Sequence, residues 1–147
     1  DGTGTACPCG NNGAPGHGCA NSGYPAGGLL VASGNASVAN DTVRLDASSM
    51  TGGVCIFFQG DTQMAPVIVD DGLGCVTGSI VRLTLQGVAG GASWYPYPGD
   101  LPISLRGSVS PSGGTYYYQC FYRNPSSAFC PPATSNRTNG VAITWAP

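Results

Sequence analysis

Apolar and polar residues alternate along much of the chain after residue 28, as in strands that bury one face. The strongest example is the run 115–123, which is rich in aromatic and β-favouring side chains and lies between Gly113-Gly114 and Asn124-Pro125. Because aromatic rings fall on both faces, we predict a central strand that contacts protein on both sides. One face would hold Tyr116, Tyr118, Cys120 and Tyr122, and the other Tyr117, Gln119, Phe121 and Arg123.

The same pattern predicts further short strands, each bounded by turn residues. They cover residues 29–33, 36–39, 42–47, 54–59, 66–69, 79–86, 101–109 and 141–145. We expect Ile103, Leu105 and Trp145 to be buried, and Pro66 to begin an edge strand. About eight or nine strands with this spacing predict an all-β, antiparallel β-sandwich of jelly-roll or Ig-like type.

Composition supports the same fold class. The 147 residues include 24 Gly and 12 Pro but neither Lys nor Glu, two residues that favour exposed helix surfaces. The length suits a single domain, residues 1–147. Residues 1–28 contain almost no large apolar side chain, so we predict a Gly/Cys-rich N-terminal cap or arm, ordered by disulfide bonds.

Charge excludes some classes of partner. Five Arg and seven Asp give a net charge of −2, which leaves no basic face for nucleic acid. The apolar runs are too short to span a membrane. A surface with so few charges lacks the usual protection against self-association, so we expect a homo-oligomer or polymer.

Seven cysteines in a small Gly-rich chain indicate an oxidising, extracellular compartment. Because Cys55 and Cys120 lie in the middle of predicted strands, we predict that they pair, and that Cys75 pairs with Cys130. The local alternative, Cys55 with Cys75 and Cys120 with Cys130, stays open. The odd count leaves one cysteine of the cap, among Cys7, Cys9 and Cys19, for an upstream or intersubunit partner.

Two groups of residues contain metal-ligand types. Cys7, Cys9, Cys19 and His17 have the donors of tetrahedral zinc, but the tight Cys-x-Cys spacing and an oxidising compartment favour disulfides. Asp70-Asp71-Gly72, with Asp61 and Asp100, offers oxygen ligands for calcium without EF-hand spacing, and Asp-Gly favours a turn. We therefore expect no metal and no cofactor.

Catalytic chemistry has no recognisable pattern in this sequence. There is one His, no Gly-x-Ser-x-Gly motif and no carboxylate pair in a known frame. We predict no catalytic residues and a protein that is not an enzyme.

The loop 94–98 is the main candidate contact surface. The rings of Trp94, Tyr95 and Tyr97, stiffened by two prolines, would stack on a glycan or on a neighbouring subunit. In the alternative interpretation, Trp94 and Tyr97 fold back over one end of the sandwich. Three sequons, at Asn35, Asn40 and Asn136, are candidate glycosylation sites on surface loops.

Several motifs together give a resemblance that runs through nearly the whole chain. They are GTGTACPCGN, GCANS, FFQG, DDGLGC followed by SIVRL, and AFCPPAT with TNGVAITWAP. The chain resembles a family of secreted bacterial domains that has no established activity. The resemblance implies secretion and an eighth cysteine, in a Cys-Phe-Gly just ahead of Asp1. Cys75 and Cys130 match that family's pattern, whereas Cys55 and Cys120 depart from it.

These observations favour a secreted, non-catalytic structural protein that assembles into an extracellular filament, coat or matrix. We expect residues 1–28 to contact an adjacent subunit in a head-to-tail interface. The alternative is a carbohydrate-binding module that uses the aromatic loop.

Overall fold

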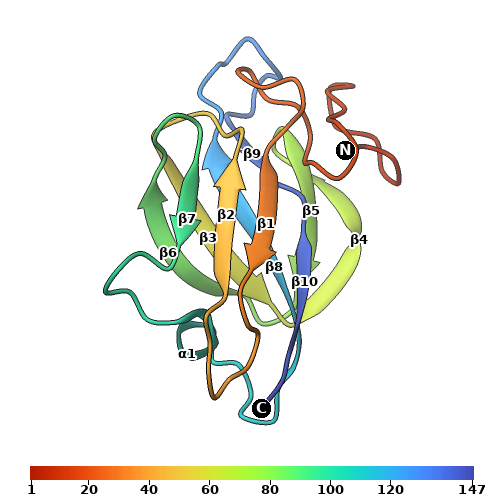
Figure 1. The fold of residues 1–147 in the computed structure, drawn as a ribbon. Helices are drawn as coiled ribbons and strands as arrows, with labels where there is room; N and C mark the ends of the chain where they lie inside the picture. Colours follow the sequence, from red (N-terminus) through yellow and green to blue (C-terminus); the bar gives the residue numbers. More distant parts are fainter.

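The computed structural model, which describes residues 1–147, confirms an all-β fold in which the strands pair antiparallel (Figure 1). There are ten strands and one short helix. They are β1 (Leu29–Ser33), β2 (Arg44–Ser48), β3 (Val54–Gly60), β4 (Thr62–Val69), β5 (Gly72–Thr77), β6 (Val81–Gly87), β7 (Ser93–Tyr95), α1 (Ile103–Arg106), β8 (Gly114–Arg123), β9 (Ser135–Arg137) and β10 (Val141–Trp145).

Two sheets enclose the hydrophobic core. A three-stranded sheet has the order β1-β2-β7, and a larger sheet has the order β10-β8-β3-β6, with β9 paired to β8. Figure 1 shows β1, β2 and β7 in front of β3, β6 and β8, with β4 and β5 beside them. The hairpin β4–β5 forms a separate sheet that packs on the outer face of the larger one, since Gln119 of β8 bonds the backbone of β5.

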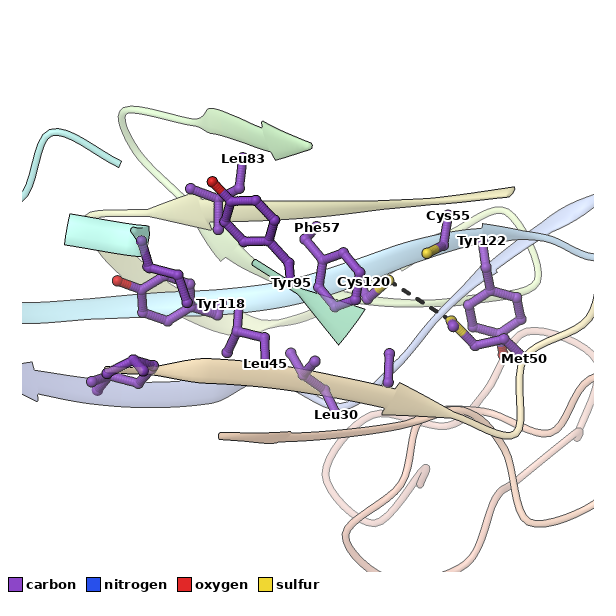
Figure 2. Close-up of a cluster of buried hydrophobic side chains, with 14 of the residues drawn as sticks. Leu30, Leu45, Met50, Cys55, Phe57, Leu83, Tyr95, Tyr118, Cys120 and Tyr122 are labelled. Carbon is purple, nitrogen blue, oxygen red and sulfur yellow. Dashed lines mark hydrogen bonds between the residues drawn. The ribbon is translucent and has the colours of Figure 1, made fainter. Parts of the chain in front are cut away.

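The aromatic strand β8 is central, as predicted. It pairs with β3 on one side and with β10 and β9 on the other. Tyr118, Cys120 and Tyr122 point into the core and are fully buried (Figure 2). On the opposite face, Gln119 is buried beneath the hairpin, which confirms that both faces meet protein.

A chain of hydrogen bonds satisfies the polar groups in this core. The indole N–H of Trp145 donates to the hydroxyl of Tyr118 at 2.9 Å, and that hydroxyl donates to Gln59 Oε1 at 2.9 Å. Gln59 Nε2 in turn donates to the carbonyl of Gly107 at 2.8 Å. Because buried polar groups are costly without partners, this chain fixes how β3, β8 and β10 pack.

Two predicted strands are wrong. Residues 101–109 contain the helical turn α1, in which Ile103 is buried but Leu105 is 62% exposed, against the alternation that we expected. The turn is held from outside, because Arg106 Nε donates to the carbonyl of Leu83 and the amide of Ser104 donates to Asp41. Residues 36–39 form only an isolated bridge, between Ser37 and Ala146.

Candidate functional site

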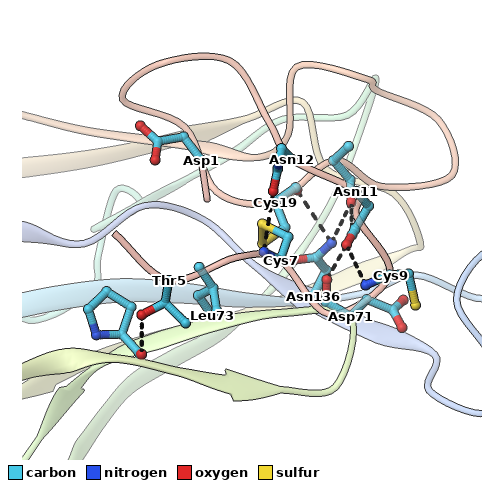
Figure 3. The surroundings of a disulfide bond; sticks show 12 residues. Asp1, Thr5, Cys7, Cys9, Asn11, Asn12, Cys19, Asp71, Leu73 and Asn136 are labelled. Atoms are coloured by element: carbon cyan, nitrogen blue, oxygen red, sulfur yellow. Dashed lines mark hydrogen bonds between the residues drawn. A yellow bond between two sulfur atoms is a disulfide. The ribbon is translucent and has the colours of Figure 1, made fainter. Parts of the chain in front are cut away.

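Two disulfides order the N-terminal segment, as its composition predicted. Cys7 pairs with Cys19 inside the segment (Figure 3). Cys9 pairs with Cys130, near the C-terminal end of the chain. Cys7, Cys9 and Cys19 are therefore all in disulfides and do not provide thiolate ligands for zinc. His17 instead lies with Nδ1 3.0 Å from the carbonyl oxygen of Gly27.

The predicted pairings of the other cysteines are wrong. Cys130 is bound to Cys9, so it is not available to Cys75 or to Cys120. Cys55, Cys75 and Cys120 are free, and none of the cap cysteines is left unpaired. The odd cysteine therefore lies in the strands and not in the cap.

The register of β3 and β8 explains why Cys55 and Cys120 do not form a bond. Cys55 lies opposite Tyr122, and Cys120 lies opposite Phe57, so the two cysteines are diagonal neighbours on one face. Diagonal neighbours lie about 7–8 Å apart, beyond the Cα separation that most disulfides span. The Cys120 thiol instead lies 3.8 Å from the sulfur of Met50, and complete burial raises the pKa of Cys120.

The cap packs closely on its own chain. Asn21 Nδ2 donates to the buried hydroxyl of Tyr122 at 2.9 Å, and Asn11 Nδ2 donates to the carbonyl of Asp71 at 2.9 Å. Gly18 passes so near β9 that an added Cβ would lie 2.1 Å from the carbonyl oxygen of Arg137. Residues 1–28 are thus a cap on one end of the sandwich, held by side-chain amides as well as by cross-links.

The three sequons differ in exposure. Asn136 is fully buried, and its amide donates to the carbonyl of Ala20 in the cap at 2.9 Å. The prediction that Asn136 lies on a surface loop is therefore wrong, because its amide nitrogen already bonds the cap. Asn35 and Asn40 are exposed.

The Asp-Gly segment is a turn, as its composition favoured. Asp70 and Asp71 connect β4 to β5, and Asp70 adopts a φ of 56°. Asp71 is buried, accepts a hydrogen bond from Asn124 Nδ2 at 2.7 Å, and leaves its Oδ1 without a partner. Burial raises the pKa of Asp71. No group of three or more His, Cys, Asp or Glu residues is placed to hold a metal ion.

The aromatic loop divides into buried and exposed rings. Tyr95 belongs to the core, where its hydroxyl donates to the carbonyl of Leu101, so predicting it as a contact residue was wrong. Trp94 is 37% exposed and contacts the ring of Tyr97, with a centroid separation of 4.4 Å. The guanidinium of Arg44 lies 4.8 Å from the centre of the Trp94 ring and forms an ion pair with Asp46. Trp94 and Tyr97 therefore form a small aromatic surface outside the core.

Strand β4 presents an open edge, which sequence reasoning identified only in part. It pairs with β5 on one side and with no strand on the other. None of its eight residues is charged, and Val67 and Ile68 are 45% and 58% exposed. The cap reaches this strand at one point, where the hydroxyl of Thr5 donates to the carbonyl of Pro66 (Figure 3).

No family model, curated protein or solved structure matches the chain. The helix α1 has four residues, and the protein has no helix with the length and apolar character needed to cross a membrane.

Proposed function

We propose that the protein is a secreted, non-catalytic structural protein whose copies associate through the open edge of β4 into an extracellular filament, coat or matrix. The observation that carries this proposal is an eight-residue edge strand with no charged side chain. Proteins usually protect such an edge with charge, because unpaired backbone groups offer a template to another chain. The two disulfides are typical of extracellular proteins.

The contact would be centred on the second half of β4. Pro66 has no N–H, the pairing with β5 is irregular between Gln63 and Val67, and the Pro66 carbonyl already accepts a bond from Thr5. These features block the edge as far as Pro66, the fifth of its eight residues. Residues 67–69 follow without interruption, and the exposed side chains of Val67 and Ile68 would be covered by the neighbouring copy.

The free thiols suggest a second link between copies. Cys55 and Cys120 are fully buried, whereas Cys75 is only half-buried and lines a polar cavity of about 360 Å³ beside Asp1. Cys75 is therefore the cysteine that we assign to a partner outside these residues.

The experiment compares the wild-type protein with the single variant Ile68→Lys. Adjacent side chains of a strand point to opposite faces, so Ile68 points away from the face on which Val69 lies. A lysine at position 68 therefore places a charge on the strand edge without entering the space between the hairpin and the larger sheet. Sedimentation velocity and electron microscopy at increasing concentration should show large assemblies for the wild type and monomers for the variant. Thermal unfolding should show that the variant is still folded.

The matched control is Leu105→Lys, which places the same charge on a residue of α1 that is 62% exposed. This control should assemble like the wild type. A wild-type protein that stays monomeric at millimolar concentration would refute the proposal, and so would assembly by Ile68→Lys equal to that of the control.

Carbohydrate binding is the second candidate function. It is favoured by the exposed ring of Trp94 and the half-buried ring of Tyr97, which lie beside the charged groups of Arg44 and Asp46. Aromatic rings next to charged hydrogen-bonding groups suit a sugar, which has both apolar faces and hydroxyls. Screening against glycans should then detect binding that Trp94→Ala abolishes, and no glycan binding at all would reject this candidate.

A further inference from the structure

A largely apolar groove lies between the hairpin β4–β5 and the outer face of the larger sheet. Its volume is about 450 Å³, and seven of its nine lining residues are hydrophobic. Ile56 and Phe58 of β3 and Phe121 of β8 form one wall. Met64, Val69 and Val76 of the hairpin form the other. A groove of this volume and character is within the range of small-molecule sites.

The seventh hydrophobic lining residue is Ile80, and the two lining residues that are not hydrophobic are both arginines, Arg82 and Arg137. They are two of only five basic residues in the chain, and neither takes part in the protein's single ion pair, which joins Arg44 to Asp46. Two cations without salt-bridge partners therefore lie at one apolar groove, in a protein whose net charge is negative.

Arg137 is the more constrained of the two. Its guanidinium lies 5.3 Å from the centre of the Phe58 ring, and its Nε is buried without a hydrogen-bond partner. Desolvation lowers the pKa of Arg137, while the nearby Asp70 opposes this shift. A guanidinium stays protonated at physiological pH, so its buried N–H needs an acceptor that the protein itself does not supply.

We propose that this groove binds an aliphatic monocarboxylate. The alkyl chain would lie between the hairpin and the sheet, and the carboxylate would accept hydrogen bonds from Arg137 and face the charge of Arg82. Charge complementarity decides the class of ligand. A neutral hydrocarbon would leave both arginines unpaired, and a sugar would bury hydroxyls against a wall with no polar partner.

The hairpin suits such a ligand because its own two strands pair irregularly beside the groove. The pairing of β4 with β5 is irregular just after Met64, and methionine side chains adapt to irregular spaces. The groove would therefore accept chains that differ in length by a few carbons. This inference is independent of the proposed assembly, because Ile68 points away from the groove and Ile68→Lys leaves the groove intact.

The experiment is calorimetric titration of the folded protein with decanoate, with decanol and acetate as partial ligands. Decanoate should bind saturably in a one-to-one ratio. Decanol, which lacks the charge, and acetate, which lacks the chain, should both bind more weakly. Loss of a charged hydrogen bond predicts that Arg137→Gln weakens decanoate binding by about tenfold or more. Arg82→Gln should weaken it less, because Arg82 is exposed to solvent.

Two further variants make the test specific to the groove. Arg123→Gln removes an exposed arginine of β8 that does not line the groove, and it should bind decanoate like the wild type. Ile56→Trp adds bulk to the wall and should abolish binding while Arg137 stays in place. Circular dichroism checks that each variant folds. If Arg137→Gln does not fold, the two single variants Ile56→Trp and Arg82→Gln still test the proposal.

Three outcomes would overturn the proposal. Decanol that binds as tightly as decanoate would show a non-specific apolar surface. Binding that Ile56→Trp leaves unchanged would place the ligand elsewhere. Failure of decanoate to bind the monomeric Ile68→Lys variant would show that the groove binds no aliphatic carboxylate. Contact with a second copy of the chain would then be the explanation to test for this apolar groove.

Discussion

Replacing each disulfide pair by serine tests how the cap contributes to stability. The two bonds close loops of very different length, with sequence separations of 121 for Cys9–Cys130 and 12 for Cys7–Cys19. In the chain-entropy model, a cross-link stabilises the folded state by restricting the unfolded chain, and the effect grows with the logarithm of loop length. The longer loop should therefore contribute more.

The chain-entropy model gives the size of the difference in stabilisation between the two disulfides. A loop of the longer length corresponds to about 5 kcal/mol and one of the shorter length to about 3 kcal/mol. The double variant Cys9→Ser/Cys130→Ser should therefore lose about 2 kcal/mol more stability than Cys7→Ser/Cys19→Ser. The larger loss is comparable to the whole stability of many domains, which is about 5–15 kcal/mol. The first variant should consequently be the closer of the two to unfolding at room temperature.

The assay is urea unfolding followed by circular dichroism, with the free energy of unfolding and its urea dependence fitted for each variant. Cys75→Ser is the matched control, because it removes a sulfur without opening a disulfide. Equal losses for the two double variants, with unchanged urea dependence, would refute the entropic reasoning. A larger loss from the short loop would show that the cap is stabilised mainly through local contacts.

Two further substitutions test buried polar groups. Tyr118→Phe leaves the Trp145 indole N–H and Gln59 Oε1 without partners, which should cost about 2–5 kcal/mol in urea unfolding, whereas Tyr117→Phe should cost almost nothing. Burial raises the pKa of Asp71 above its usual 3.8, so the folded state holds the proton of this carboxyl more tightly than the unfolded state does. The stability of the wild-type protein should therefore fall as the pH rises from 3.8 through the raised pKa. Asp71→Asn does not titrate, so the melting temperature of this variant should rise relative to that of the wild type as the pH increases above 3.8. Parallel curves of melting temperature against pH would contradict the assignment.

Long alternating segments predicted their strands well. β10 has the predicted bounds, and β3 and β8 differ from the predictions by one residue at an end. These segments are bounded by turn residues and bury one clear apolar face, so local pattern and tertiary packing agree. The segment 101–109 has the same alternation over fewer apolar positions. There the bond from Arg106 to Leu83, far away in sequence, favours a helical turn.

Strands that pack away from the core had no such signal. β5 contains two glycines, and β9 consists of Ser135, Asn136 and Arg137. β5 pairs with β4, β9 pairs with β8, and Asn136 of β9 bonds the cap, so apolar periodicity is not required of either strand. Asn136 is buried because it bonds the cap, which the sequence around it cannot reveal. The sequon at this position was therefore misleading, and only the location of the cap explains it.

The cysteine pairing was unpredictable for the same reason. A mid-strand position suggested that Cys55 and Cys120 cross-link the core, but register decides whether two strand cysteines lie opposite or diagonal, and register is not visible in one sequence. Cys9 and Cys130 pair because the cap folds back over the end of the sheet. Nothing local to either residue indicates that arrangement.

The position of the cap also determines which surfaces remain for partners. Residues 1–28 were expected to reach a neighbouring subunit, but their amides and both disulfides are engaged by their own chain. A segment held in this way would have to break buried hydrogen bonds before it could cross to another copy. The edge of β4 needs no such rearrangement beyond Pro66, because no strand pairs with it on that side and Ile68 is already exposed. If copies of this protein associate, the lower-cost contact is therefore the strand edge, with the cap keeping the end of each sandwich closed.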